Sequence, residues 1–197
     1  MQNKKVFVAG CGGLGCYDVE FLARLGAGSV TVADGDVFTE GNMSRQLYCV
    51  PETLGRNKAE AAAARWPGKA RAVPCFVSAE NAQELLEGCD IVIDALDSAK
   101  ARKMLAAECE KAGIPMIHGA IGGKTSQCCV IFPGDRDILD ILYPEDCGKN
   151  ETVSYVPALC ASLQTALAAK ILNGEDVPER TLYITDLETM DFGTVKL

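Results

Sequence analysis

The chain has 197 residues, a formal net charge of −8 at pH 7, and 48% hydrophobic against 23% charged residues. This length suits one compact domain, and the apolar share excludes a mainly disordered chain. The acidic balance excludes the global basic field that nucleic-acid binding or attachment to an anionic membrane requires.

The N-terminal two thirds of the chain alternate between strand-like and helix-like segments. Short apolar or β-branched runs predict strands at residues 5–9, 29–33, 70–77 and 91–93, with a further strand beginning at Met116. Helical spacing or alanine-rich composition predicts helices at residues 14–25, 58–65 and 99–112. Such alternation predicts a parallel sheet with helices on both faces.

The C-terminal part has a different pattern. We expect a strand at 126–132, a polar loop at 133–151, a long amphipathic helix at 157–172, and two last strands at 182–185 and 192–197. We detect no repeat or linker. We therefore expect a single α/β domain over residues 1–197, with a Rossmann-like sheet that is parallel in its N-terminal part and antiparallel at its C-terminal edge.

No apolar run approaches the length of a membrane span, and the basic start leads at once into a short buried strand, unlike a signal peptide. The ten cysteines are scattered through the chain. We interpret them as reduced thiols and expect a cytoplasmic protein.

The turn after the first predicted strand carries Gly10, Gly12, Gly13 and Gly15 in the pattern G-x-G-x-x-G. Glycines there allow backbone to approach a phosphate, and the following helix offers free N–H groups. Asp34 ends the second strand 19 residues after Gly15, where an acid accepts hydrogen bonds from a ribose. The combination predicts a nucleotide site and leaves the nucleotide open.

The next segment departs from a plain dinucleotide fold. It places Asn42, Arg45, Gln46 and Lys58 beyond the ribose-binding acid. A pair of cations beside phosphates can neutralise charge during phosphoryl or adenylyl transfer. Spacing alone fits the alternative equally well, in which the arginine and lysine are solvated on a surface turn.

These segments, together with Asp94-Ala95-Leu96-Asp97, Ser162-Leu163-Gln164 and Asp186 to Phe192, resemble the ThiF/MoeB/HesA family over nearly the whole chain. That family is related to the adenylation domain of ubiquitin-activating enzymes. The resemblance implies an adenylyltransferase that uses ATP and Mg²⁺. Its substrate would be the C-terminal glycine carboxylate of a small ubiquitin-like sulfur carrier of the ThiS/MoaD type, ending in Gly-Gly, which becomes an acyl-adenylate. It also implies a homodimer.

The resemblance assigns roles to particular residues. Arg45, Lys58 and Asp97 would be catalytic, and Asp97 would hold Mg²⁺. Asp34 would hold the ribose, and Asn42, Arg45 and Lys58 would contact the phosphates. The full nucleotide-binding set implied is Gly10, Gly12, Gly13, Gly15, Asp34, Asn42, Arg45, Gln46 and Lys58.

Several features depart from the family pattern. No C-x-x-C pair occurs, so we expect no structural zinc. An arginine that some members carry before the first strand is missing, which leaves open a degenerate member that binds a carrier or partner without catalysis. An NAD-dependent oxidoreductase is less favoured, because the length leaves little room for a substrate domain. Cys147 is suitably placed for a transfer thiol, although an incidental loop cysteine is the favoured interpretation, and His118 is interpreted as structural.

Overall fold

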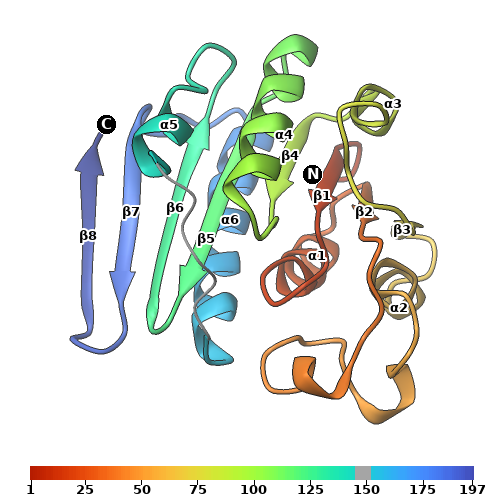
Figure 1. Ribbon diagram of the computed structural model, residues 1–197. Coiled ribbons are helices and arrows are strands. Elements are labelled where there is room, and N and C mark those ends of the chain that lie inside the picture. Colours follow the sequence, from red (N-terminus) through yellow and green to blue (C-terminus); the bar gives the residue numbers. More distant parts are fainter. Residues whose placement is uncertain (145–151) are drawn as a thin grey trace.

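The computed structural model describes residues 1–144 and 152–197. Its centre is an eight-stranded sheet in the order β3-β2-β1-β4-β5-β6-β7-β8 (Figure 1). The strands are β1 (Lys5–Ala9), β2 (Ser29–Ala33), β3 (Ala70–Val73), β4 (Ile91–Asp94), β5 (Met116–Gly122), β6 (Thr125–Ile131), β7 (Thr181–Asp186) and β8 (Asp191–Lys196). β1 to β5 are parallel, whereas β6, β7 and β8 each pair antiparallel with the preceding strand. The predicted Rossmann-like sheet with an antiparallel C-terminal edge is confirmed.

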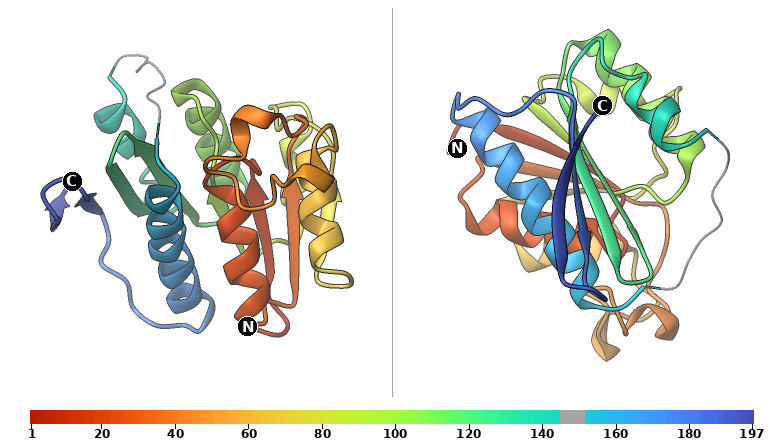
Figure 2. Two further views of the ribbon diagram at one scale, coloured as in Figure 1. Left: turned by 90° about the horizontal axis from the view of Figure 1, so that it is seen from below. Right: turned by 90° about the vertical axis from the view of Figure 1, so that its left-hand side faces the viewer.

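Helices cover both faces of the parallel part of the sheet (Figure 2). One face carries α1 (Gly15–Arg24), α2 (Lys58–Arg65) and α6 (Tyr155–Leu172), and the other carries α3 (Ala82–Leu86), α4 (Ala99–Ala112) and α5 (Ile138–Leu142). In β1, Val6 and Val8 pack into the first layer of core, while Phe7 and Ala9 pack into the second. A strand buried on both faces has a continuous apolar sequence, which is why this segment could be predicted.

The structure corrects the predicted boundaries in three places. β3 ends at Val73, because Pro74 has no N–H to extend the ladder; the predicted strand at 70–77 was too long. α3 was not predicted. α5 lies within the predicted polar loop at 133–151, where Ile138 and Leu139 are fully buried and anchor a helical turn to the core.

Helix α6 is long and apolar enough, by length and composition alone, to cross a membrane. The prediction that no apolar run approaches the length of a membrane span was wrong for this segment, and so was the prediction of an amphipathic helix. In the fold, α6 runs along β5 and β6 and beside α1 (Figure 2), and half of it is buried inside the protein. Its hydrophobicity all round is that of a core helix.

Candidate functional site

A cavity of about 1130 Å³ lies at the carboxyl ends of the parallel strands. β1 sits between β2 and β4 in the sheet, so the chain crosses to opposite sides of β1 in successive units. Such a reversal of strand order leaves a crevice where open α/β sheets bind their ligands. The cavity walls come from the turn after β1, the segments after β2, β3 and β4, and the β5–β6 hairpin.

Two of the four glycines in the turn after β1 pack so closely against backbone that a Cβ would clash, and the other two leave room for one. Gly10 has a φ of +94°, and a Cβ there would lie 2.7 Å from the carbonyl oxygen of Ala95. A Cβ on Gly15 would lie 2.0 Å from the carbonyl oxygen of Gly10. At Gly12 and Gly13, the nearest atoms to such a Cβ are 3.8 and 3.9 Å away. Gly10, Gly12 and Gly13 line the cavity, whereas Gly15 closes the turn at the start of α1 and does not.

Asp34, just after the end of β2, connects this turn to the next segment. Its carboxylate accepts hydrogen bonds from the backbone N–H groups of Cys11 at 2.7 Å and Asp36 at 2.8 Å, one on each oxygen. Each carboxylate oxygen can accept a further hydrogen bond. Since Asp34 also lines the cavity, it can receive sugar hydroxyls without giving up the contacts that hold the turn.

Asn42 shapes the turn that presents Arg45. Its side-chain oxygen accepts hydrogen bonds from the N–H and hydroxyl of Thr39, at 3.0 and 3.1 Å, and its carbonyl accepts the N–H groups of Arg45 and Gln46. Asn42 is not among the residues that line the cavity, whereas Arg45 and Gln46 are. Its contact with phosphate stays a prediction.

Arg45 is partly exposed on the cavity wall, and its guanidinium donates to the carbonyl of Gly41 at 2.9 Å. Gln46 is buried against the glycine turn, with its Nε2 3.8 Å from the Cβ position of Gly12. The Gln46 side-chain oxygen is buried and has no partner among the described residues. A buried, unpaired polar atom beside a phosphate-type turn is consistent with a polar ligand there.

Lys58 is the first residue of α2 and is held in place before any ligand binds. Its ammonium lies 3.1 Å from a carboxylate oxygen of Asp36, and the residue is largely buried. Asn57 caps α2 by accepting the N–H of Glu60, and its amide donates to the carbonyls of Asp34 and Asp36. The same short segment therefore fixes the acid at the end of β2 and the lysine at the start of α2.

Asp97 is exposed on the wall formed by the segment after β4. The cavity thus gathers most of the predicted site residues: Gly10, Gly12, Gly13, Asp34, Arg45, Gln46, Lys58 and Asp97. Cys147, the possible transfer thiol, lies outside the described residues.

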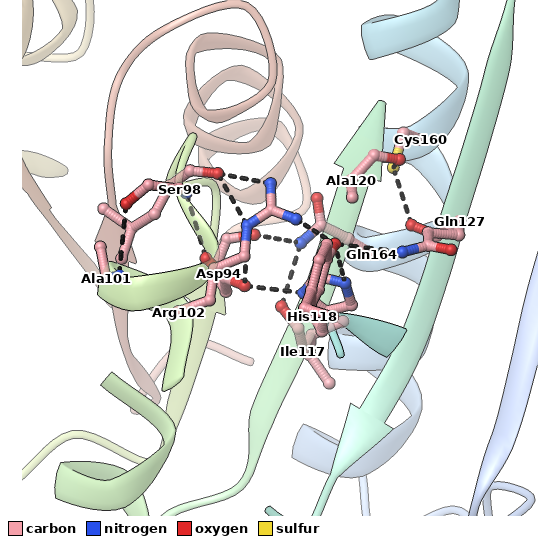
Figure 3. Close-up of polar contacts among 12 residues, drawn as sticks. Asp94, Ser98, Ala101, Arg102, Ile117, His118, Ala120, Gln127, Cys160 and Gln164 are labelled. Carbon is pink, nitrogen blue, oxygen red and sulfur yellow. Dashed lines mark hydrogen bonds and ion pairs between the residues drawn. The ribbon is translucent and has the colours of Figure 1, made fainter. Parts of the chain in front are cut away.

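The opposite side of the cavity rests on a buried polar network (Figure 3). Asp94 Oδ2 is 2.7 Å from His118 Nδ1, and His118 Nε2 is 3.2 Å from the Tyr143 hydroxyl. Burial lowers the pKa of His118, against the raising effect of the Asp94 carboxylate, so the ring is neutral and Nδ1–H donates to Asp94. Nε2 then accepts from the Tyr143 hydroxyl, which itself accepts from Gln127 at 3.1 Å and from Arg102. His118 is fully buried and does not line the cavity, which favours the structural interpretation.

Arg102 is a cavity-lining cation that the sequence analysis missed. Its Nε and Nη2 donate to the carbonyl of Leu96 at 3.1 and 2.6 Å, and Nε is 3.9 Å from Asp94. Ser98 caps α4 by accepting the N–H of Ala101, and the cavity is lined by Ala99 and Arg102 from the first turn of that helix. The sequence did offer a signal for Arg102, which is a cation about one turn after a residue that typically caps a helix. Tyr143 and Gln127 gave no such signal, because they reach the cavity only through tertiary contacts.

Comparison with known proteins adds to this geometry. A model described as "ThiF family" matches residues 1–197. The chain is 33% identical to the SAMP-activating enzyme E1 of Haloferax volcanii, covering 99% of this chain and 77% of that protein. It is 28% identical to the molybdopterin-synthase adenylyltransferase of Escherichia coli, covering 100% of this chain and 84% of that protein.

Among solved structures, E. coli MccB with ATP has the same fold, with a TM-score of 0.81 and 18% identity over 99% of this chain and 64% of that one. The chain spans only about half the length of several other curated relatives it matches, for example 46% of a zebrafish adenylyltransferase and sulfurtransferase MOCS3 and 56% of the Bacillus subtilis ThiS adenylyltransferase.

Proposed function

This chain belongs to the ThiF family, and we propose that it is an enzyme that uses ATP to activate the C-terminal glycine carboxylate of a small ubiquitin-like sulfur carrier protein. The product would be an acyl-adenylate, with release of pyrophosphate. One observation carries the proposal: a glycine turn, a ribose-type acid, the cations Arg45 and Lys58, and the exposed carboxylate of Asp97 share one cavity. The names of the relatives, which are activating enzymes and adenylyltransferases of carrier proteins, agree with it.

The residues of this chain supply binding and charge rather than a nucleophile. Free N–H groups of the glycine turn and of the start of α1 donate hydrogen bonds to phosphate oxygens, and the Asp34 carboxylate accepts hydrogen bonds from the ribose hydroxyls. The carrier carboxylate attacks the α-phosphorus, and negative charge grows on the α-phosphate and on the departing pyrophosphate. Arg45 and Lys58 stabilise that charge from fixed positions, at no cost in reorganisation during the reaction.

Mg²⁺ fits the same wall. An exposed aspartate would repel a triphosphate if no cation lay between them. Mg²⁺ commonly binds one or two carboxylates together with the phosphates of the substrate, so this aspartate suits it. Asp97 would hold the ion, which when bound would neutralise phosphate charge. We propose no zinc, since the sequence has no C-x-x-C pair.

The partners are part of the proposal. A cavity of about 1130 Å³ is larger than most small-molecule pockets, which span about 300–1,000 Å³, and leaves room for a peptide end beside a nucleotide. We propose a carrier ending in Gly-Gly, a cytoplasmic location and a homodimer. Light scattering at micromolar concentration tests the dimer, and the mass of a monomer would contradict it.

The test of the function is carrier-dependent exchange of labelled pyrophosphate into ATP, run with a panel of small ubiquitin-like carriers. We expect exchange with a Gly-Gly carrier and none with the same carrier after removal of its last two residues. ATP binding without exchange on any carrier would favour the degenerate binding member. Calorimetry that finds tight NAD binding and no ATP binding would favour the oxidoreductase.

A further inference from the structure

Phe76 is the most exposed large hydrophobic side chain in the described residues, with 66% of its surface accessible. It lies in the segment between β3 and α3 and lines the cavity. Exposing a phenylalanine to water costs free energy in proportion to its apolar area. An aromatic ring left open on the wall of a nucleotide-type cavity therefore has a candidate role in binding.

The segment that carries Phe76 is held in place. The side-chain amide of Asn81 donates to the carbonyl of Phe76 at 2.9 Å, and its oxygen accepts the N–H of Ser78 at 2.8 Å. Asn81 thus clamps the backbone on both sides of Val77, the residue next to Phe76 that also lines the cavity. The ring is presented by a clamped turn rather than by a free loop.

The ring itself rests on backbone. Its Cδ2, Cε2 and Cγ atoms lie 2.6, 2.7 and 2.9 Å from the place where a Cβ on Gly35 would stand. Only a glycine leaves room for the ring at that distance, so the ring packs directly on the backbone of Gly35. The ring is therefore supported on one side and open elsewhere along the cavity wall.

Gly35 follows Asp34 directly, and this places the ring beside the ribose site. The phosphate-type groups, Gly12, Gly13 and Lys58, lie around the glycine turn that Asp34 contacts through Cys11. A nucleoside triphosphate whose ribose is held by Asp34 extends its phosphates toward that turn. Its base then extends away from it, and Phe76 and Val77 are the apolar lining residues from the segment after β3, the neighbour of β2.

We propose that Phe76 is the stacking wall for the base of the nucleotide. This deepens the proposed function and rests on it. The ring would lie against the flat face of the base, and such stacking tolerates different bases because every base has a π-face. Asn81 and Gly35 would act as positioning residues that hold the ring in place.

Calorimetry on the full chain, with ATP and with inorganic tripolyphosphate, tests the proposal. We expect Phe76→Ala to weaken ATP binding by about 5- to 100-fold and to leave tripolyphosphate binding unchanged. Phe76→Tyr should keep wild-type affinity for ATP. Gly35→Ala, which keeps Phe76 but displaces its ring, should show the same selective loss as Phe76→Ala.

Phe192→Ala is the matched control, because Phe192 is 61% exposed on β8 and does not line the cavity. It should bind both ligands as the unaltered chain does. Circular dichroism and melting temperature check that each variant is folded.

Wild-type ATP affinity in a folded Phe76→Ala variant, or an equal loss for ATP and tripolyphosphate, would overturn the stacking role while the proposed function stands. Absence of ATP binding by the unaltered chain would overturn both.

Discussion

The two sides of the cavity are built in different ways. One side, called here the motif wall, is formed by the glycine turn, Asp34, Arg45, Gln46 and Lys58. It comes from the turn after β1 and from the segment between the end of β2 and the start of α2, and its cations are Arg45 and Lys58. The other side rests on the network wall, defined as Asp94, Arg102, His118, Gln127 and Tyr143. Its groups are contributed by β4, α4, β5, β6 and the end of α5.

The two walls differ in whether their polar groups find partners inside the protein. On the network wall, the donors and acceptors satisfy one another inside the protein, so removing a member leaves a buried group unpaired. On the motif wall, within residues 1–144 and 152–197, the Gln46 side-chain oxygen is unpaired and Lys58 has a single partner, the largely exposed Asp36. The motif wall is therefore suited to a ligand, and the network wall to holding shape. Substitutions should separate the two, with effects on activity from the first and on stability from the second.

The largest expected effect is on the network wall. His118→Ala removes the donor that faces the buried Asp94 carboxylate at 2.7 Å. A buried charged acceptor that loses its donor costs about 1–3 kcal/mol or more, and the cavity left by the fully buried ring brings the expected total to about 3–5 kcal/mol. We expect a loss of that size in the free energy of unfolding, measured by urea denaturation. His118→Asn, whose amide can replace Nδ1–H, should recover part of it. A loss below about 1 kcal/mol, the upper end of the range for exposed pairs, would show that the network carries little stability.

The next effect tests the motif wall together with Asp97, which lies after β4. Lys58→Ala, Arg45→Ala and Asp97→Ala should each lower kcat/KM for carrier-dependent pyrophosphate exchange by about 10²–10³-fold, or about 2.7–4 kcal/mol. The first two would each remove a fixed positive charge from the transition state, and the third would remove the proposed ligand of Mg²⁺. Lys4→Ala is the control, since Lys4 forms an ion pair of the same 3.1 Å length with Asp90 but does not line the cavity. If all three site variants exchange at the wild-type rate, the residue assignments are wrong even though the family is right.

A smaller effect probes the contact between the motif wall and the sugar. Asp34→Ala should weaken ATP binding by about 1.5–3 kcal/mol, the value of hydrogen bonds to a charged acceptor. Calorimetry with ATP and with 2′,3′-dideoxy-ATP separates this loss from damage to the turn that Asp34 holds. The unaltered chain should prefer ATP, and Asp34→Ala should not distinguish the two. A variant that still prefers ATP would place the ribose elsewhere.

The same contrast explains how much could be predicted from the sequence. The motif wall depends on glycines, an acid and a lysine that follow consecutive strands of a parallel sheet, so their positions in the sequence place them at the same edge of that sheet. The cavity brings most of them together, as predicted. Arg102 and Tyr143 meet only because α4 and the end of α5 pack on the same face of the sheet, and no local pattern carries that information. Phe76 escaped notice for another reason: it lies inside the strand predicted at 70–77, whereas β3 ends at Val73, and its ring meets Gly35 only through the tertiary fold.

The smallest expected effect compares two buried aspartates. Asp94 is paired with His118, whereas Asp18 in α1 is fully buried and neither of its carboxylate oxygens has a partner among the described residues. Burial first, and the Asp94 carboxylate second, raise the pKa of Asp18 well above its usual range. The folded chain therefore holds Asp18 protonated at pH values where the unfolded chain ionises it.

Stability should accordingly fall as pH rises above the usual aspartate pKa, by up to about 1.4 kcal/mol per pH unit, until the raised pKa is reached. Asp18→Asn keeps the shape without the ionisation, so its gain in unfolding free energy should be near zero at about pH 3 and about 1.5 kcal/mol at about pH 5. Urea denaturation at the two pH values measures the gain, with Asp176→Asn as the exposed control that gains nothing. A loss of stability in Asp18→Asn at pH 5 would mean that the carboxylate has a stabilising partner in solution, and the contrast with Asp94 would fail.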